Sequence, residues 1–317
     1  QACPPDTTSE AGFSSGAWNV VGDAIEAGED CVQLTSTFLN QKGAAWHDCP
    51  IDLGAQFDLG FTVNLGDQDQ FGADGMCFVL QQAGNVESGV SPIGDDGFAL
   101  GYAGGPFEPS LVVEIDTWQG GVNGDPFFDH IGIGRDGSVT HNVSPPIQAD
   151  PESINIETGL DCAFRITWDP FTSLLEVHFN DSMRHSITID LLGDVFAGDP
   201  LVYWGWTGST GGASNIQSFC LVEAIYEVLG CTYENAINFD PFATIDDGSC
   251  EDPSGCEDPC GLAYEGDNDG LVGIGDLLGL LSEFGDTCES VADAACGNSV
   301  NHQGYDYEMV LIGEQCW

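Results

Sequence analysis

Basic side chains are nearly absent from this chain of 317 residues, and their scarcity excludes two classes of partner. Lys and Arg total 4 against 52 Asp and Glu, which gives a formal net charge of -48 at pH 7. Binding to phosphate groups needs a basic surface, so nucleic acids and anionic membrane surfaces are excluded as partners. Because so much negative charge repels itself, bound divalent cations are expected to stabilise the folded chain.

The sequence also lacks long apolar runs, and its first 230 residues contain almost no helix signals. No stretch has the length and apolarity of a transmembrane span or a signal peptide, so no membrane insertion is expected. The 13 cysteines, in contrast, indicate disulfide bonds formed in an oxidising compartment. Such a chain must be exported. We therefore expect Gln1 to be a mature N-terminus and the protein to be extracellular, either secreted or attached to a cell surface.

Zinc binding is the alternative use of so many cysteines. It would need paired cysteines or histidines at short spacing, and Cys256 and Cys260 form the nearest such pair, with no second pair following at the usual distance. The odd cysteine count leaves at least one thiol free, bonded to another molecule, or paired with a cysteine outside this sequence.

The first 230 residues are typical of one all-β domain. Short runs of alternating apolar and polar residues are separated by turns rich in Gly, Asp and Pro. The clearest runs are 57–65, 111–118, 162–169, 174–180 and 185–191. About 230 residues suit a single sandwich of two packed antiparallel sheets, a jelly-roll.

One stretch, residues 111–133, combines four side chains of the kinds that bind metal ions. Glu114 and Asp116 lie two apart in a β-branched run, so a strand would point both carboxylates to one face. Asp125 and His130 follow after a Gly-rich loop. Carboxylates suit a hard cation such as Ca²⁺, whereas an added imidazole suits a transition ion such as Mn²⁺. The alternative is a surface loop whose acids are only solvated.

This stretch resembles the metal-binding segment of the L-type, or legume-type, lectins, whose pattern is V-E-x-D-T-aromatic, then Asp-Pro, then His-Ile-Gly-Ile. The resemblance implies that Glu114 and His130 hold a transition ion. It implies that Asp116 and Asp125 bridge this ion and Ca²⁺, and that the Trp118 carbonyl also serves Ca²⁺.

The sequence departs from the lectin pattern at Gly120. The family places an Asn there, which ligates Ca²⁺ and also contacts the sugar, and the nearest candidate in this chain is Asn123. The departure bears on calcium geometry and on sugar contacts more than on the presence of a metal site.

Further segments resemble sugar-contacting parts of the same family. In residues 71–81, Asp74 matches the Asp that accepts hydrogen bonds from two sugar hydroxyls and follows a cis Ala-Asp peptide; an Asp-Gly hairpin turn is the alternative. Gly104 and Gly105 match a glycine whose backbone N–H donates to the sugar. The resemblance also assigns residues 207–214, including Gly208, Ser209 and Thr210, to a wall of the site.

These features predict a non-enzymatic, calcium-dependent carbohydrate-binding domain, a lectin or adhesin with glycans as partners. A glycoside hydrolase of the same fold class is the less favoured alternative, because its motif needs a second Glu where this chain has Gln119, and Gln cannot donate the proton. The other alternative is a structural unit of an extracellular filament, sheath or adhesin stalk, associating with copies of itself or with other surface modules.

The composition changes after residue 230. The last 87 residues carry 19 acids, seven cysteines and no Lys or Arg. Residues 231–251 resemble a short cysteine-bounded repeat of large secreted bacterial proteins, especially those exported by type IX systems. The resemblance implies a disulfide between Cys231 and Cys250, worth about 3 kcal/mol by restricting the unfolded chain.

Two more small modules are expected after that repeat. Residues 252–297 contain a dockerin-like calcium loop, in which Ca²⁺ would be bound by the side chains and one carbonyl of the following residues: Glu265, Asp267, Asp269, Leu271 and Asp276. The alternative there is an Asp-Gly turn before an amphipathic helix. Residues 298–317 resemble the opening strand of a further secreted module, so we expect the sequence to be a piece of a longer protein.

Overall fold

The computed structural model describes residues 18–28, 30–82, 91–121 and 123–226, parts of 229–251, and four short strands between residues 300 and 316. The chain divides into two units, Gln1–Glu251 and Asp252–Trp317. The described strands of the second unit form two antiparallel pairs: β18 (Val300–His302) with β19 (Tyr305–Tyr307), and β20 (Leu311–Ile312) with β21 (Gln315–Cys316). The predicted calcium loop, residues 265–276, lies outside the described residues.

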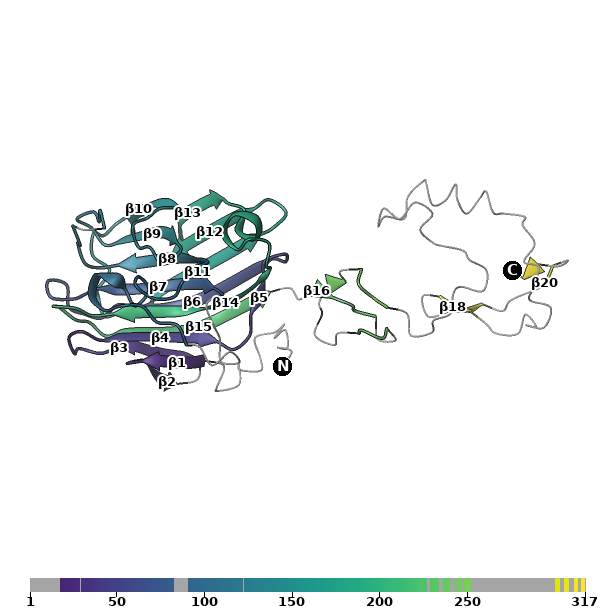
Figure 1. Cartoon of the computed structure of the whole chain (residues 1–317), viewed down its shortest axis with the longest axis horizontal. Coiled ribbons are helices and arrows are strands. Elements are labelled where there is room, and N and C mark those ends of the chain that lie inside the picture. Colours follow the sequence, from purple (N-terminus) through teal and green to yellow (C-terminus); the bar gives the residue numbers. More distant parts are fainter. Residues whose placement is uncertain are drawn as a thin grey trace. The chain divides into compact units, whose positions relative to one another are not determined.

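The first unit contains two antiparallel sheets stacked face to face (Figure 1). The first sheet has the strand order β1-β4-β14-β7-β8-β9-β10, with β5 paired to β14. Its strands are β1 (Trp18–Gly22), β4 (Lys42–His47), β5 (Ile51–Asp52), β7 (Gly75–Gln81), β8 (Ser110–Asp116), β9 (His130–Arg135), β10 (Ser144–Gln148) and β14 (Leu201–Ser209).

The second sheet has seven strands in the order β13-β12-β11-β6-β15-β3-β2. They are β2 (Ile25–Gly28), β3 (Cys31–Thr35), β6 (Phe57–Asn64), β11 (Cys162–Asp169), β12 (Leu174–Phe179), β13 (Ser182–Thr188) and β15 (Gln217–Tyr226). Helical structure in the described residues is limited to a 3-10 turn, η1 (Gly97–Ala99), and a π-helical turn, η2 (Leu191–Val195). The predicted all-β sandwich is confirmed.

Alternation along the strands produces the core between the sheets. In β6, Phe57, Leu59, Phe61 and Val63 are buried and the residues between them are half-buried, because successive side chains point to opposite faces. Aromatic rings from both sheets meet in this layer, with Phe61 against Trp206 at 5.3 Å between ring centroids.

The opposite face of the first sheet is covered as well, which explains why β7 and β8 are buried at every position. A second apolar cluster lies there, formed by side chains from β4, β7 and β8 and from the segments after β7 and β9: Ala44, Trp46, Cys77, Val79, Leu100, Tyr102, Phe107, Val112 and Val139. Glu114 and Asp116 alternate in phase with Val112, so they point to this covered outer face rather than into the main core.

Two disulfides are present in the described residues. One joins Cys31 of β3 to Cys220 of β15, which face each other in the strand register. The other joins Cys231 to Cys250, the pairing that the repeat resemblance implies. Cys77 and Cys162 are buried free thiols.

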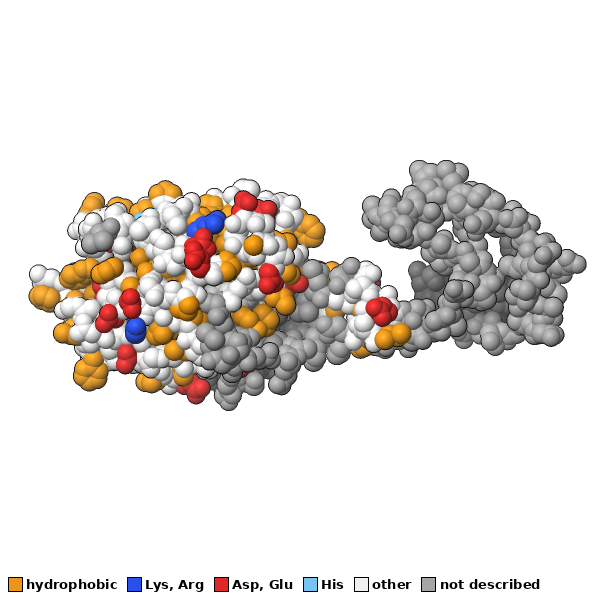
Figure 2. Space-filling model, viewed as in Figure 1, with side chains coloured by type: hydrophobic (Ala, Val, Ile, Leu, Met, Phe, Trp, Pro, Cys, Tyr) orange, Lys and Arg blue, Asp and Glu red, His pale blue; other side chains and the backbone are white. Residues whose placement is uncertain are grey.

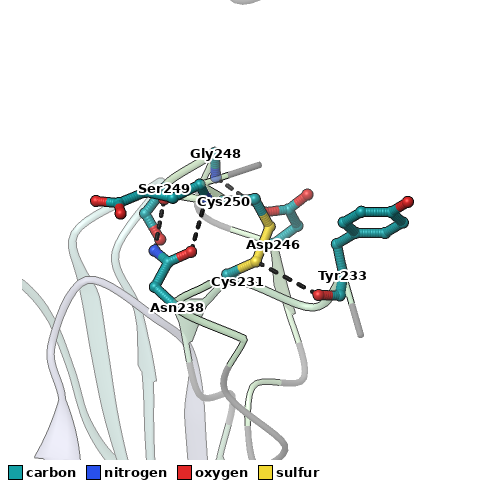
Figure 3. The surroundings of a disulfide bond; sticks show 8 residues. Cys231, Tyr233, Asn238, Asp246, Gly248, Ser249 and Cys250 are labelled. Carbon is teal, nitrogen blue, oxygen red and sulfur yellow. Dashed lines mark hydrogen bonds between the residues drawn. A yellow bond between two sulfur atoms is a disulfide. The ribbon is translucent and has the colours of Figure 1, made fainter. Parts of the chain in front are cut away.

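The Cys231–Cys250 disulfide joins the two ends of a short segment (Figure 3). Asn238 fastens the end of the loop, because its amide donates to the Ser249 carbonyl at 2.6 Å and its side-chain oxygen accepts from the Glu251 N–H at 2.7 Å. β16 (Leu229–Gly230) pairs in parallel with β17 (Ile245–Asp246). Such a small segment depends on its cross-link for stability.

Three of the four basic side chains in the sandwich, those of Lys42, Arg135 and Arg165, are paired with acids. Lys42 lies 3.6 Å from Asp95, and the Arg165 Nε atom donates to Asp58 at 2.7 Å. On the face shown in Figure 2, Lys and Arg appear as isolated spots beside acidic side chains. Within the described part of the chain, no helix has the length and apolar character needed to cross a membrane.

Candidate functional site

The strand register brings three of the predicted metal-binding residues together. Asp116 at the end of β8 is paired with His130 at the start of β9, and Glu114 is paired with Gly132. All of these side-chain positions share the outer face of the sheet, where Glu114 is 2% exposed and His130 is 1% exposed. The His130 Nε2 atom lies 3.6 Å from Glu114 Oε1.

Asp125 reaches the same point from the loop between β8 and β9. Its Oδ1 atom lies 3.9 Å from His130 Nε2, and its Oδ2 atom accepts from the Gly120 N–H at 2.8 Å. One ligand atom from each of Asp116, Asp125 and His130 lies within 4.8 Å of the others. The structure therefore brings together the four side chains that the sequence singled out.

A further histidine, His141, joins this group and was missed in the sequence. It belongs to the turn between β9 and β10, and its Nε2 atom contacts Glu114 Oε1 and lies 3.1 Å from His130 Nε2. Glu114, His130 and His141 form a second set of possible ligands, again with donor atoms within 4.8 Å. We refer to the five side chains of Glu114, Asp116, Asp125, His130 and His141 as the cation cluster.

Burial shifts the pKa values of the acids in the cation cluster. It raises the pKa of Asp116 well above its usual range, and the carboxylates of Glu114 and Asp125 raise it further. Burial also acts to raise the pKa of Glu114, but hydrogen bonds from His130 and His141 outweigh it, so that pKa is lowered. Three buried carboxylates and two imidazoles thus share one enclosed site.

A divalent cation fits this donor set. The Asp125 Oδ1 atom is buried and has no hydrogen-bond partner among the described residues, although a buried acceptor normally has one. Carboxylate oxygens and imidazole nitrogens are the donors that calcium and first-row transition ions prefer. A bound cation would satisfy Asp125 and remove the repulsion among the acids.

Asp74 lies beside the cation cluster, directly before β7. The Ala73–Asp74 peptide is cis. The Asp74 N–H donates to Ser209 at 3.0 Å, and its carbonyl accepts from the Thr117 N–H at 3.0 Å, so both neighbouring strands hold its backbone. Gly75 pairs with Asp116 in the strand register, which places Asp74 next to a cluster acid in the sheet.

The Asp74 carboxylate has an unused acceptor. The residue is 5% exposed, and its Oδ2 atom has no hydrogen-bond partner among the described residues. Burial raises the pKa of Asp74 to about 7, and Asp96 adds to the shift. A ligand hydroxyl that donates to Oδ2 would supply the missing hydrogen bond.

Two glycines other than Gly104 and Gly105 lie beside the Asp74 carboxylate. A Cβ atom on Gly211 would lie 3.1 Å from Asp74 Oδ2 and 3.0 Å from the Cα atom of Gly97. Gly104 instead packs against Asp95, and Gly105 packs against the Phe107 ring. Gly211, within the predicted wall 207–214, and Gly97, missed in the sequence, therefore lie beside the Asp74 carboxylate.

The predicted wall residues at the end of β14 have structural partners. Ser209 and Thr210 are buried, and their hydroxyls donate to the carbonyls of Gly97 at 2.7 Å and Phe38 at 2.8 Å. Gly208 lies within β14 and packs against Leu34. These three residues position the loop, and the residues after them approach Asp74.

Asn123 and Trp118 occupy the rim of this region. The Asn123 amide donates to the Phe98 carbonyl at 3.3 Å, which ties the β8–β9 loop to the turn containing Gly97. The Trp118 N–H donates to Asp116 Oδ1 at 2.7 Å, and the Trp118 residue is 40% exposed. Asn123 therefore lies on the Asp74 side of the loop.

Comparison with known protein families decides the identity of this fold. The profile of the legume lectin β-barrel domain matches residues 9–223. The chain belongs to the legume lectin family. We refer to residues 9–223 as the lectin domain, and they include Asp74 and the whole cation cluster.

Solved legume lectin structures share the fold of the lectin domain. The lectin from Bauhinia forficata in complex with GalNAc is 19% identical, with a TM-score of 0.54 over 68% of this chain and 93% of that chain. Lectin II from Ulex europaeus is 20% identical, with a TM-score of 0.53 over 67% of this chain and 92% of that chain.

A plant receptor shows a similarity in sequence as well. A probable L-type lectin-domain containing receptor kinase from Arabidopsis thaliana is 31% identical over 141 residues, which cover 42% of this chain. The matched part spans only 21% of that relative's own length, so the similarity concerns a segment of the receptor and not the whole protein.

Membership in a lectin family indicates sugar binding rather than catalysis. The chain contains a non-enzymatic, legume lectin-like carbohydrate-binding domain, as the sequence predicted. The glycoside hydrolase alternative, already weakened by Gln119, receives no support from the family match.

Proposed function

We propose that the lectin domain binds a glycan over Asp74 in a reaction that depends on divalent cations. The observation that carries the proposal is the buried Asp74 Oδ2 atom, which has no hydrogen-bond partner among the described residues and lies beside Gly211, a residue without a side chain. When ionised, the Asp74 carboxylate accepts hydroxyl hydrogen bonds, each worth about 1.5–3 kcal/mol because the acceptor is then charged.

The cation cluster lies next to the proposed sugar site. In the proposal, Ca²⁺ is held by Asp116, Asp125, the Trp118 carbonyl and Asn123, and a second, transition ion such as Mn²⁺ is held on the imidazole side. When bound, these ions neutralise the buried acids next to Asp74. The N–H of Thr117, one residue beyond Asp116, donates to the Asp74 carbonyl. A displacement of Asp116 would therefore also shift the backbone of Asp74.

The proposed setting is a secreted or surface-attached, multi-domain bacterial protein. The disulfides of the first unit support an oxidising environment. The dockerin-like loop at Glu265, Asp267, Asp269, Leu271 and Asp276 stays a prediction, and Asp269→Ala should lower the calcium stoichiometry by one. Adhesion through many weak sugar sites would be multivalent.

The sugar-binding proposal is tested with Asp74→Asn. The amide keeps the shape of the side chain but loses the charge and one acceptor, so glycan affinity should fall at least tenfold, which corresponds to 1.4 kcal/mol. The measurement is glycan-array binding followed by calorimetric titration of the best glycan, with circular dichroism to verify the fold.

Asp181→Asn is the matched control, since Asp181 is exposed, lies in the turn between β12 and β13, and has a positive φ that Asn also tolerates. Full glycan binding by folded Asp74→Asn protein would place the sugar elsewhere. Absence of glycan binding by the unaltered protein would favour the structural role in a filament or stalk.

A further inference from the structure

We infer that His141 is a direct ligand of the transition ion in the cation cluster, which gives this position two imidazoles and a preference for Zn²⁺ over Mn²⁺. The inference deepens the cation site of the proposed function and rests on it. It starts from a residue of the β9–β10 turn that lies outside the predicted metal-binding stretch.

The two imidazole nitrogens have the spacing of ligands that share one ion. Ligands about 2.0–2.1 Å from one ion lie about 2.9 Å apart at octahedral angles and about 3.3 Å apart at tetrahedral angles. The Nε2 atoms of His130 and His141 are 3.1 Å apart, and His130 Nε2 lies 3.6 Å from Glu114 Oε1. Asp125 Oδ1 lies 3.8 Å from His141 Nε2 and lacks a hydrogen-bond partner among the described residues.

The fold prepares a place for the His141 ring. A Cβ atom on Gly132 would lie 2.3 Å from His141 Cδ2 and 2.6 Å from Glu114 Oε1, so the absence of a side chain in β9 lets the ring lie over Glu114. The side chain of His141 is 5% exposed. A side chain this enclosed contacts the ion without a large rearrangement.

The turn that carries His141 is itself anchored at both ends. The next residue, Asn142, accepts from the Arg135 N–H at 2.9 Å through its side-chain oxygen, and the Val143 N–H donates to Ile133 at 3.0 Å. Val139 is buried in the second apolar cluster. The imidazole is therefore presented by a fixed turn rather than by a free loop.

Imidazole donors change which ion is preferred. Mn²⁺ is well served by carboxylates and water, whereas Zn²⁺ and the late transition ions gain more from nitrogen ligands and stand higher in the Irving–Williams order. A site with Glu114, His130 and His141 on one side and shared Asp116 and Asp125 on the other should select Zn²⁺.

If His141 were a counter-ion and not a ligand, its removal would change metal affinity in the opposite direction. Protonated His141 would be a counter-ion for Glu114 and would compete with a metal for the same carboxylate. Removing the imidazole would then raise metal affinity, whereas loss of a ligand lowers it. The two roles are distinguishable by the sign of one measured change.

The first experiment uses the unaltered protein. Cu²⁺ is added as a paramagnetic probe at one equivalent, and pulsed electron paramagnetic resonance counts the coordinated imidazoles. Two imidazoles are expected, and a count of one overturns the inference. Failure to bind Cu²⁺, Zn²⁺ or Mn²⁺ at all would instead contradict the proposed cation site itself.

The second experiment measures Zn²⁺ and Mn²⁺ affinities of His141→Ala and His141→Gln by competition with a chromophoric chelator. Zn²⁺ affinity should fall at least tenfold and Mn²⁺ affinity less, so that the preference for Zn²⁺ shrinks. His178→Ala, altered in the other sheet, is the control and should leave both affinities unchanged. Unchanged or higher Zn²⁺ affinity in the His141 variants overturns the inference.

Discussion

Phe98 presents an exposed ring beside the proposed sugar position. It follows Gly97, its carbonyl accepts from Asn123, and the residue is 56% exposed. An apolar ring of this kind packs against the C–H face of a sugar, and covering part of it contributes roughly 1–2 kcal/mol.

We therefore expect Phe98→Ala to lower glycan affinity about tenfold in calorimetric titrations while leaving metal stoichiometry unchanged. Phe171→Ala is the matched control, because Phe171 is 85% exposed and belongs to the β11–β12 turn of the other sheet. Equal affinities for the Phe98→Ala variant and the unaltered protein would exclude Phe98 from the sugar contact.

Glu157 is a buried acid whose protonation should influence stability. It is 4% exposed, and its Oε1 atom accepts from the Asn215 amide at 2.8 Å. Burial raises the pKa of Glu157 to about 8, with Asp129 adding to the shift against the hydrogen bond from Asn215. Between its ordinary value of 4.5 and 8, the folded state binds a proton that the unfolded state has lost, so stability falls as pH rises.

Glu157→Gln removes this titration and keeps an oxygen for Asn215. Its stability relative to the unaltered protein should rise between pH 5 and 8 by at most about 1.4 kcal/mol per pH unit. Denaturant unfolding at several pH values checks the difference. A stability difference that does not vary with pH would show that Glu157 ionises normally in the folded state.

At the scale of single elements, the disulfide between β3 and β15 closes the longest covalent loop in the described residues. Cys31 and Cys220 are 189 residues apart in sequence. Loop-closure entropy sets an upper value of about 5 kcal/mol for its contribution to stability. The double variant Cys31→Ala/Cys220→Ala should therefore unfold at clearly lower denaturant concentration, while a Cys162→Ala control, which alters a free thiol, should lose only packing energy. Equal midpoints for the double variant and the unaltered protein would contradict this expectation.

The strands and four residues of the cation cluster could be predicted because they follow from the spacing of residues along the sequence. The two-residue spacing of Glu114 and Asp116 places them on one face in any strand, and His130 begins the next apolar run. The alternation of β6 and β11 likewise identifies the face that packs in the core.

The remaining site residues come together through the three-dimensional course of loops and turns. Loops and turns have no periodic pattern in the sequence from which this course could be predicted. His141 lies in a turn with φ 54°, and only the fold of that turn over Gly132 brings it to Glu114. Gly97 lies in the same glycine-rich region as Gly104 and Gly105, and the route of the 91–107 loop decides which glycine meets Gly211.

At the scale of the whole molecule, the formal charge of -48 sets the conditions under which the protein works. Few cations are available within the chain, and Lys42, Arg135 and Arg165 already pair with acids. Divalent ions can neutralise the buried acids beside Asp74 without protonating them. Sugar binding and cation binding are therefore expected to be linked.

The most direct test of this linkage is glycan binding by one preparation in three states: as purified, stripped with EDTA, and restored with Ca²⁺ plus Zn²⁺ or Mn²⁺. Binding should be lost on stripping, and the apparent affinity should return within about twofold on restoration, with metal content followed by mass spectrometry and the fold by circular dichroism. Undiminished glycan binding by folded protein shown to contain no metal would contradict the account.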